Sequence, residues 1–116
     1  MRRGEIWLAD LDPSRGSESN KVRPVVIVSN DAHNRVARRL GRGVLTVVPL
    51  TSSTRRVLTF QVLIERESSG LPRDSKAQAE QVRALDVSRL VERAGCLTRE
   101  QLAAVDDALM LHLDLN

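Results

Sequence analysis

Short apolar segments separated by polar turns run along most of the chain. Residues 5–10 (EIWLAD) alternate polar and apolar positions, as a half-buried β-strand does. Residues 24–29 (PVVIVS) form a nearly continuous run of β-branched side chains, and residues 44–51 (VLTVVPLT) form a second such run. Continuous apolar runs of this length predict strands that are buried on both faces. Pro49 lies late in the second run and predicts a sheet edge or a bulge there.

The segments between these strands predict a long loop and a short helix. Residues 11–22 contain proline, glycine, serine and asparagine, which are typical of loops. This loop is long for a hairpin connection, and long loops in small domains often bind ligands. Asn30 and Asp31 are good caps for a helix over residues 32–40, which ends at the glycines that follow.

The second half of the chain predicts further strands and one terminal helix. Three strand candidates follow one another: residues 59–65, 75–84 and 92–97. Thr98 then opens a helix, with Gln101 placed three residues later as in a capping box. Several short strands followed by one capped helix predict a single domain over residues 1–116. It is expected to be mainly β with α, built as a small bent barrel that the helix closes.

Arginine dominates the basic residues of the chain. All but two of its 18 lysines and arginines are arginines, the formal net charge is +3, and the pI is about 10.0. The guanidinium group offers a planar fork of donors that matches a phosphate group, although a GC-rich genome would produce the same bias. Only Trp7 and Phe60 are aromatic. This argues against a base-stacking platform and against a module that binds proline-rich peptides.

The rarer residue types bear on compartment and cofactors. The single cysteine, Cys96, excludes an intrachain disulfide, and the apolar stretches are too short for a secretory signal or a membrane span. We therefore expect a cytoplasmic protein that does not enter membranes. His33 and His112 lack neighbours at metal-ligand spacing, and the sequence has no glycine-rich nucleotide loop. Neither a metal ion nor a cofactor is expected.

One polar cluster spans the long loop and the start of the strand after it. Gly16, Ser17 and Glu18 lie in the loop, and Arg23 precedes Pro24 where the buried strand begins. A permanently charged arginine at the mouth of a strand can hold an anion, and the proline fixes the backbone beside it. Composition alone favours a plainer interpretation, in which Arg23 is one more solvated surface arginine.

Two further clusters combine hydroxyl or amide groups with arginines. One follows the second buried strand: Thr51, Ser52, Arg55 and Arg56. Such groups at a strand end can bind phosphate oxygens, although serine and threonine also favour plain polar turns. The other cluster contains Gln81 and Arg83, which share one face if their segment is a strand. Both would then be free to contact a ligand, unless Arg83 simply pairs with an acidic neighbour.

In the order and spacing of these clusters, the chain resembles the MazF/PemK family of toxin–antitoxin endoribonucleases along nearly its full length. The motifs that carry the resemblance are RGEIW at 3–7, DP at 12–13, GSE at 16–18, RPVVIVSN at 23–30, PLTS at 49–52 and EQVR at 80–83. The resemblance implies an SH3-like β-barrel with a short helix after the second strand and a C-terminal helix. It also implies a homodimer with single-stranded RNA along the dimer groove.

The resemblance further implies which residues act. Arg23 and Thr51 correspond to the catalytic arginine and threonine of the family, and Glu18 corresponds to a loop glutamate that is our candidate general base. Eight other residues are expected to bind RNA: Gly16, Ser17, Lys21, Ser52, Arg55, Arg56, Gln81 and Arg83. The implied cleavage is sequence-specific and needs no metal. The 2′-hydroxyl of the RNA attacks, and 2′,3′-cyclic phosphate and 5′-hydroxyl ends remain.

The resemblance implies a protein partner as well. Such toxins arrest translation and growth and are neutralised by a cognate acidic antitoxin, whose charge would complement a basic groove. The alternative is a non-enzymatic toxin of the same barrel class that binds DNA gyrase, as in the CcdB-like family. That function would need neither Arg23 nor Thr51. An RNA cleavage assay run beside a gyrase supercoiling assay separates the two.

Overall fold

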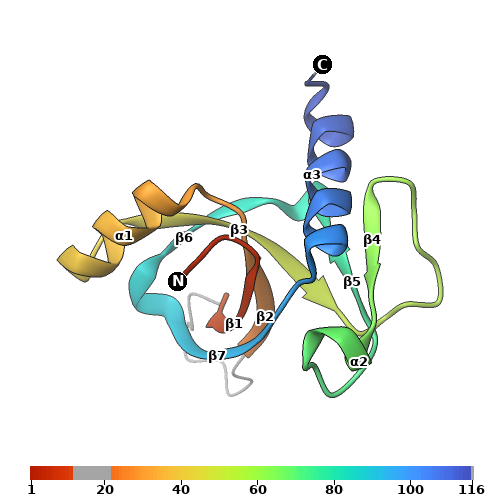
Figure 1. Cartoon of the computed structure of the whole chain (residues 1–116), viewed down its shortest axis with the longest axis horizontal. Helices are drawn as coiled ribbons and strands as arrows, with labels where there is room; N and C mark the ends of the chain where they lie inside the picture. The colour runs from red at the N-terminus through yellow and green to blue at the C-terminus, as the bar shows by residue number, and fades with distance from the viewer. Residues whose placement is uncertain (12–21, 116) are drawn as a thin grey trace.

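The computed structural model describes residues 1–11 and 22–115, which form a curved antiparallel sheet flanked by helices (Figure 1). The strands are β1 (Glu5–Asp10), β2 (Val22–Ile27), β3 (Val44–Thr51), β4 (Gln61–Ile64), β5 (Ser75–Gln78), β6 (Arg83–Asp86) and β7 (Leu90–Cys96). The helices are α1 (Asp31–Leu40), α2 (Arg66–Ser69) and α3 (Arg99–Leu113), with 3₁₀ turns η1 (Ala79–Gln81) and η2 (Val87–Arg89). This confirms the expected mainly β architecture, with a short helix after the second strand and a C-terminal helix.

Strands β2 and β3 lie side by side in the middle of the sheet and supply much of its core. Val25 lies opposite Pro49, and Ile27 lies opposite Val47. Val25, Ile27 and Val47 pack in a cluster with α1, whereas Val26 and Val48 between them pack in a cluster with α3. Both faces of the two strands are therefore covered, as their continuous apolar sequences predicted.

Pro49 does not mark a sheet edge, because β3 has neighbours on both sides. The first half of β3 pairs with β6 as far as Val47, and its end pairs with β5 from Leu50. Pro49 lies in the interval between these two ladders. Because proline has no N–H to donate, it fits the interruption without the loss of a hydrogen bond.

The single strand expected over residues 75–84 is wrong, because η1 separates β5 from β6. Ala79 in η1 is buried and fixes the turn against the core. The local alternation of this segment suits a strand, but β5 pairs with β4 and the end of β3, whereas β6 pairs with the start of β3. The turn at η1 allows β5 to pair with β4 and the end of β3, and β6 to pair with the start of β3.

The sheet bends strongly but does not close. Its strand order is β4-β5-β3-β2-β1-β7, with β6 beside the start of β3. In Figure 1, β6 and β7 sweep around β1 and β2. Among the described strands β6 and β7 are joined through η2 without pairing to each other. The expected barrel is therefore an open one.

Helix α3 begins with the capping box that its sequence predicted. The Thr98 hydroxyl accepts a hydrogen bond from the Gln101 amide (3.1 Å), and the Gln101 side chain accepts one from the Thr98 amide (2.9 Å). Val105 is fully buried against the sheet, whereas Leu111 and Leu113 near the end of the helix are exposed. In the described part of the chain, none of the helices has the length and apolar character that a membrane span requires.

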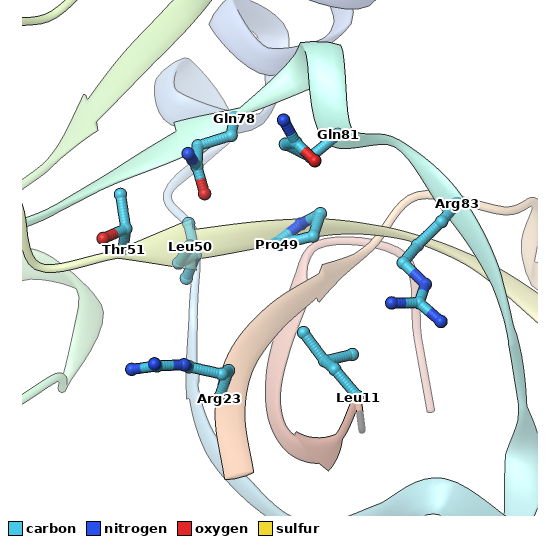
Figure 2. A pocket seen from close by; sticks show the side chains of 8 residues that line it. All are labelled: Leu11, Arg23, Pro49, Leu50, Thr51, Gln78, Gln81 and Arg83. Atoms are coloured by element: carbon cyan, nitrogen blue, oxygen red, sulfur yellow. The ribbon is translucent and has the colours of Figure 1, made fainter. Parts of the chain in front are cut away.

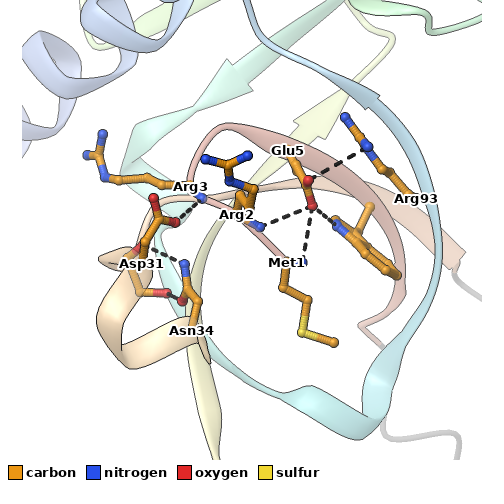
Figure 3. A network of polar contacts seen from close by, with 9 residues as sticks. Met1, Arg2, Arg3, Glu5, Asp31, Asn34 and Arg93 are labelled. Carbon is orange, nitrogen blue, oxygen red and sulfur yellow. Dashed lines mark hydrogen bonds and ion pairs between the residues drawn. The ribbon is translucent and has the colours of Figure 1, made fainter. Parts of the chain in front are cut away.

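Polar contacts tie the residues before β1 to both long helices, and Figure 3 shows the contact with α1. The Arg3 amide donates to the carboxylate of Asp31 in α1 (2.7 Å), and the Arg3 Nε donates to the Val28 carbonyl (2.9 Å). The Arg3 guanidinium also forms an ion pair with Asp106 of α3. One arginine therefore links α1, α3 and the end of β2.

Glu5 is the acidic centre of the same network and is 8% exposed. Its carboxylate accepts hydrogen bonds from the Arg2 amide (3.1 Å) and the Trp7 indole (3.0 Å), and it lies 3.7 Å from the Arg93 guanidinium. Burial raises the pKa of this carboxyl, but the hydrogen bonds and positive charges around it outweigh burial. The pKa of Glu5 therefore lies below its usual value of 4.5.

Candidate active site

The first residues of β2 and the last residues of β3 border a pocket (Figure 2). The pairing between the two strands ends with Val25 opposite Pro49. If the same antiparallel alignment is continued by two residues, Arg23 comes opposite Thr51. On its other side Arg23 pairs with Ala9 of β1, which fixes its backbone. The sheet therefore places these two side chains at one site.

Two adjoining pockets open at this point and share Arg23, Leu50 and Thr51. The larger has a volume of about 340 Å³ and is lined by Leu11, Arg23, Pro49, Leu50, Thr51, Gln78, Gln81 and Arg83. The smaller has a volume of about 180 Å³ and is lined by Val22, Arg23, Pro24, Leu50, Thr51, Ser52, Leu71, Pro72, Arg73 and Ser75. The two residues that the sequence proposed as catalytic, Arg23 and Thr51, thus line both pockets.

Arg23 presents an uncommitted charge to these pockets. The residue is exposed, and in Figure 2 its guanidinium extends to the side of the pocket where Thr51 lies. Within residues 1–11 and 22–115 it forms no ion pair, unlike Arg3 and Arg93. Because a guanidinium stays protonated at any working pH, its donors are available to an anion.

The hydroxyl of Thr51 is oriented by a local hydrogen bond. Its Oγ1 accepts from the Ser53 amide (3.2 Å), in a turn that commonly follows a strand. A hydroxyl has one proton and two acceptor lone pairs, so this bond uses a lone pair and leaves the proton available. Thr51 can therefore donate to an oxygen of a bound anion.

Residues of η1 and β6 form another wall of the larger pocket. Gln81 ends η1 and Arg83 begins β6, and both line the pocket although they do not share a strand. Figure 2 shows the Arg83 side chain pointing into the space that Arg23 also borders. The preceding acidic residue, Glu80, instead accepts a hydrogen bond from the Gln61 amide group (2.8 Å). Among the described residues Arg83 has no ion pair, so the pocket holds a second available guanidinium.

Sequence reasoning missed several residues that line the pockets. Gln78 ends β5 and adds an amide group beside Gln81 (Figure 2). Arg73 follows α2 and brings a further guanidinium to the smaller pocket. Neither residue belongs to a sequence cluster, because their segments reach Arg23 only through the pairing of β5 with β3. No signal in the sequence would have singled them out.

Some of the predicted RNA-binding residues lie elsewhere. Ser52 lines the smaller pocket, but Arg55 and Arg56 are exposed on the segment after β3 and line neither pocket. Their contact with RNA stays a prediction. Four other residues fall outside the described part of the chain: Gly16, Ser17, Glu18 and Lys21.

The described lining side chains supply guanidinium, hydroxyl and amide groups, with no carboxylate, imidazole or thiol among them. Such a set of donors suits a phosphate group, whose charged oxygens accept hydrogen bonds and attract cations. In the described residues we also find no group of three or more histidine, cysteine, aspartate or glutamate side chains arranged to hold a metal ion. The site is therefore built to bind and stabilise negative charge.

Comparison with known proteins places this chain in a family. Residues 2–113 match the family model described as PemK-like, MazF-like toxin of type II toxin-antitoxin system. The chain is 56% identical over 115 residues to endoribonuclease MazF9 of Mycobacterium tuberculosis, and the match covers 99% of this chain and 98% of that protein.

Solved structures with the same fold come from proteins of the same kind. A mycobacterial endoribonuclease in complex with its cognate antitoxin is 25% identical with a TM-score of 0.77, covering 100% of this chain and 97% of that one. MazF from Deinococcus radiodurans is 25% identical with a TM-score of 0.77, covering 99% of this chain and 97% of that one. Because the family model spans nearly the whole chain, the protein belongs to the PemK-like, MazF-like toxins of type II toxin–antitoxin systems.

Proposed function

We propose that the protein is a sequence-specific endoribonuclease toxin that cleaves single-stranded RNA. The reacting phosphate would lie in the pocket between the Arg23 and Thr51 side chains. The observation that carries the proposal is the shared pocket, where an uncommitted guanidinium and a hydroxyl with a free proton border the same space. The 56% identical relative is named as an endoribonuclease, which supports the same activity.

RNA supplies its own nucleophile, so the protein needs to position and stabilise rather than attack. The 2′-hydroxyl oxygen bonds to the adjacent phosphorus and loses its proton, while the bond from phosphorus to the 5′-oxygen breaks and that oxygen gains a proton. The products are a 2′,3′-cyclic phosphate and a 5′-hydroxyl. Arg23 offsets the charge that builds on the phosphate, and Thr51 donates to a non-bridging oxygen.

The general base in this scheme is Glu18, as the sequence resemblance suggests. It lies outside the described residues, so its role is a proposal from sequence alone. The described side chains that line the pockets include no other carboxylate. Arg23 is a poor base because its guanidinium keeps its proton. Replacement of Glu18 by glutamine should therefore slow cleavage and flatten the rise of the rate with pH.

We assign base recognition to one wall of the larger pocket, the wall that lies opposite β2. Gln78, Gln81 and Arg83 offer amide and guanidinium groups that can hydrogen-bond to the edges of unpaired bases. A duplex hides those edges, because they are already paired and stacked. We therefore expect the enzyme to cut loops and single strands in preference to stems.

The proposal includes a homodimer, a cognate acidic antitoxin and a cytoplasmic location. Exposed apolar side chains near the end of α3, Leu111 and Leu113 among them, supply a surface of the kind that a second subunit covers. In Figure 1 this end of the helix projects beyond the sheet. A structural relative was solved with its cognate antitoxin, and the basic pocket residues would attract an acidic partner. Bound there, the antitoxin would inhibit cleavage and so relieve the arrest of translation and growth.

The test is cleavage of one target sequence placed either in a loop or in a stem, with EDTA present throughout. We expect cleavage of the loop, with 2′,3′-cyclic phosphate and 5′-hydroxyl ends identified by mass spectrometry. A strict need for magnesium, or 5′-phosphate ends, would contradict the mechanism. Inhibition of gyrase supercoiling without RNA cleavage would instead support the gyrase-binding alternative.

A further inference from the structure

A further cationic pocket lies between the residues before β1 and helix α1, away from the two pockets that contain Arg23. Its volume is about 330 Å³, and it is lined by Met1, Arg2, Asp31, Arg35 and Arg38. Three guanidinium groups thus border it, against one carboxylate. That carboxylate is already engaged, because Asp31 accepts a hydrogen bond from the Arg3 amide (2.7 Å). The pocket therefore keeps an excess of positive charge.

The arginines of α1 lie on its exposed side. Asn34 and Ala37 are the buried residues of the helix, so Arg35, Arg38 and Arg39 project away from the core. Arg35 and Arg38 are three residues apart, a spacing at which like charges on a helix repel. The helix dipole favours Arg38 and Arg39, which lie in the last turn, but it does not account for Arg35. A bound anion would relieve this repulsion.

In the described residues none of the three lining arginines forms a side-chain ion pair, since the pairs found there involve Met1, Arg3 and Arg93. In this respect the three guanidinium groups resemble that of Arg23, which also has no ion pair among the described residues. Their planar donor forks suit a phosphate group in particular.

We propose that this α1 pocket binds a backbone phosphate of the RNA substrate, outside the catalytic pocket. The inference rests on the proposed endoribonuclease function and adds a second contact to it. The α1 helix is tied to the start of β3 by a contact of 2.6 Å between His33 Nε2 and the Val44 carbonyl oxygen, whereas Thr51 ends that strand. Figure 1 shows α1 at one end of the molecule and the β4–β5 hairpin at the other.

The length of β3 sets the size of RNA that could reach both sites. Its eight residues span about 23 Å at about 3.3 Å per residue. This distance corresponds to about seven nucleotides of stacked strand at about 3.4 Å each. Only an RNA that extends beyond the catalytic pocket by roughly this length should therefore use the α1 arginines.

An acidic protein segment is the other class of ligand that a cationic surface could attract. Val36 and Leu40, on the neighbouring side of α1, are exposed and would favour such a partner. However, they do not line the pocket, whose border is made by three guanidinium groups, one carboxylate and one methionine. The geometry of the pocket therefore favours phosphate, and the protein partner becomes an outcome of the test.

The experiment compares Arg35→Ala/Arg38→Ala with a matched control, Arg66→Ala/Arg99→Ala. The control removes the same charge from exposed positions on α2 and α3 that line none of these pockets. Binding is measured by fluorescence anisotropy in an Arg23→Ala background, which prevents cleavage, with RNAs of about six and about twenty nucleotides. Cleavage of the short RNA is measured separately with Arg23 intact.

We expect the α1 variant to bind the long RNA about tenfold more weakly. The slope of log affinity against log salt concentration should become shallower by about 0.7, the contribution of one lost phosphate contact. Affinity for the short RNA and its cleavage should match the control. Equal effects of the two double variants on the long RNA, or no effect of either, would overturn the inference and leave a protein partner as the ligand of this surface. If wild type cut RNA of neither length, the proposed function itself would be wrong.

Discussion

Two regions of this molecule use arginine in opposite ways. In the network before β1, Arg3 donates to Asp31 through its amide, to the Val28 carbonyl through its Nε, and to Asp106 through its guanidinium. At the pocket, Arg23 extends a similar guanidinium into open space and has no ion pair in the described part of the chain. Both residues lie at or near the start of a strand.

The difference lies in what the fold brings within reach of each side chain. Arg3 meets a carboxylate from a distant helix, so its charge stabilises the native state. Arg23 meets hydroxyl, amide and further guanidinium groups, so its charge stays available for a ligand. The comparison teaches that a paired arginine such as Arg3 ties elements of the fold together. Arg23, which has no ion pair among the described residues and lines a pocket, is instead available to a ligand.

The largest effect should follow Arg23→Ala. Cleavage is expected to fall by at least about 10²–10³, the usual loss for one donor that stabilises a transition state. Thermal stability should stay at the wild-type value, because the exposed side chain has no ion pair to lose within the described residues. Single-turnover cleavage and a melting curve check both parts. Arg23→Lys, which keeps the charge and loses the fork, should be intermediate, and wild-type activity in Arg23→Ala would refute the assignment.

Thr51→Ala should slow cleavage less, by about tenfold to a hundredfold, because a neutral donor contributes less than a charged one. Thr51→Ser keeps the hydroxyl and its bond from the Ser53 amide, so it should recover most of the rate. Rates measured at saturating RNA distinguish this from weaker binding. Equally slow serine and alanine variants would show that the methyl group, and not the hydroxyl, is what matters.

Arg3→Ala should lower stability and leave cleavage intact, which is the reverse of the effects expected for Arg23→Ala. We expect the free energy of unfolding to fall by about 1–2 kcal/mol, since a charge-assisted hydrogen bond is lost at a partly buried site. The cleavage rate per folded molecule should be unchanged. Urea denaturation measures the loss, and a double-mutant cycle with Asp106→Ala should show that the two substitutions are not additive. Additive effects would mean that the ion pair does not couple β1 to α3.

The smallest effect concerns pH and Glu5. The pKa of Glu5 is lowered in the folded state, so the unfolded chain takes up its proton first as the pH falls. The stabilisation is complete above about pH 4.5 and is lost as the pH drops through the lowered pKa. Urea denaturation at several acidic pH values should show this loss in the wild type and less of it in Glu5→Gln. Identical pH profiles for the two proteins would contradict the assignment.

Local elements of the fold could be predicted from the sequence because their causes are local. The cap of α3 needs only Thr98 and Gln101, and β3 was predicted with the bounds it has because a β-branched run strongly favours a buried strand. The break at η1 could not be predicted in this way. It depends on β5 and β6 pairing with different parts of β3, and nothing within residues 75–84 specifies those partners.

The candidate site likewise combines residues that the sequence indicated with residues that only the fold brings there. Arg23 and Thr51 were proposed from motif order and strand ends, and the register of β2 on β3 brings them together. Arg73 and Gln78 line the same pockets but were missed, because their neighbours in sequence carry no hint of phosphate binding. Their contribution exists only once α2 and β5 have folded against β3.

The sequence by itself determined most of the strands, the caps, the excess of arginine and the motifs of the family, because each depends on residues close together in the chain. Only the tertiary structure decided which arginines are paired and which are available. Whether a guanidinium meets a carboxylate depends on segments far apart in sequence, such as Arg3 and Asp106. Coulomb attraction and hydrogen bonding act over a few ångströms in space, whatever the distance along the chain.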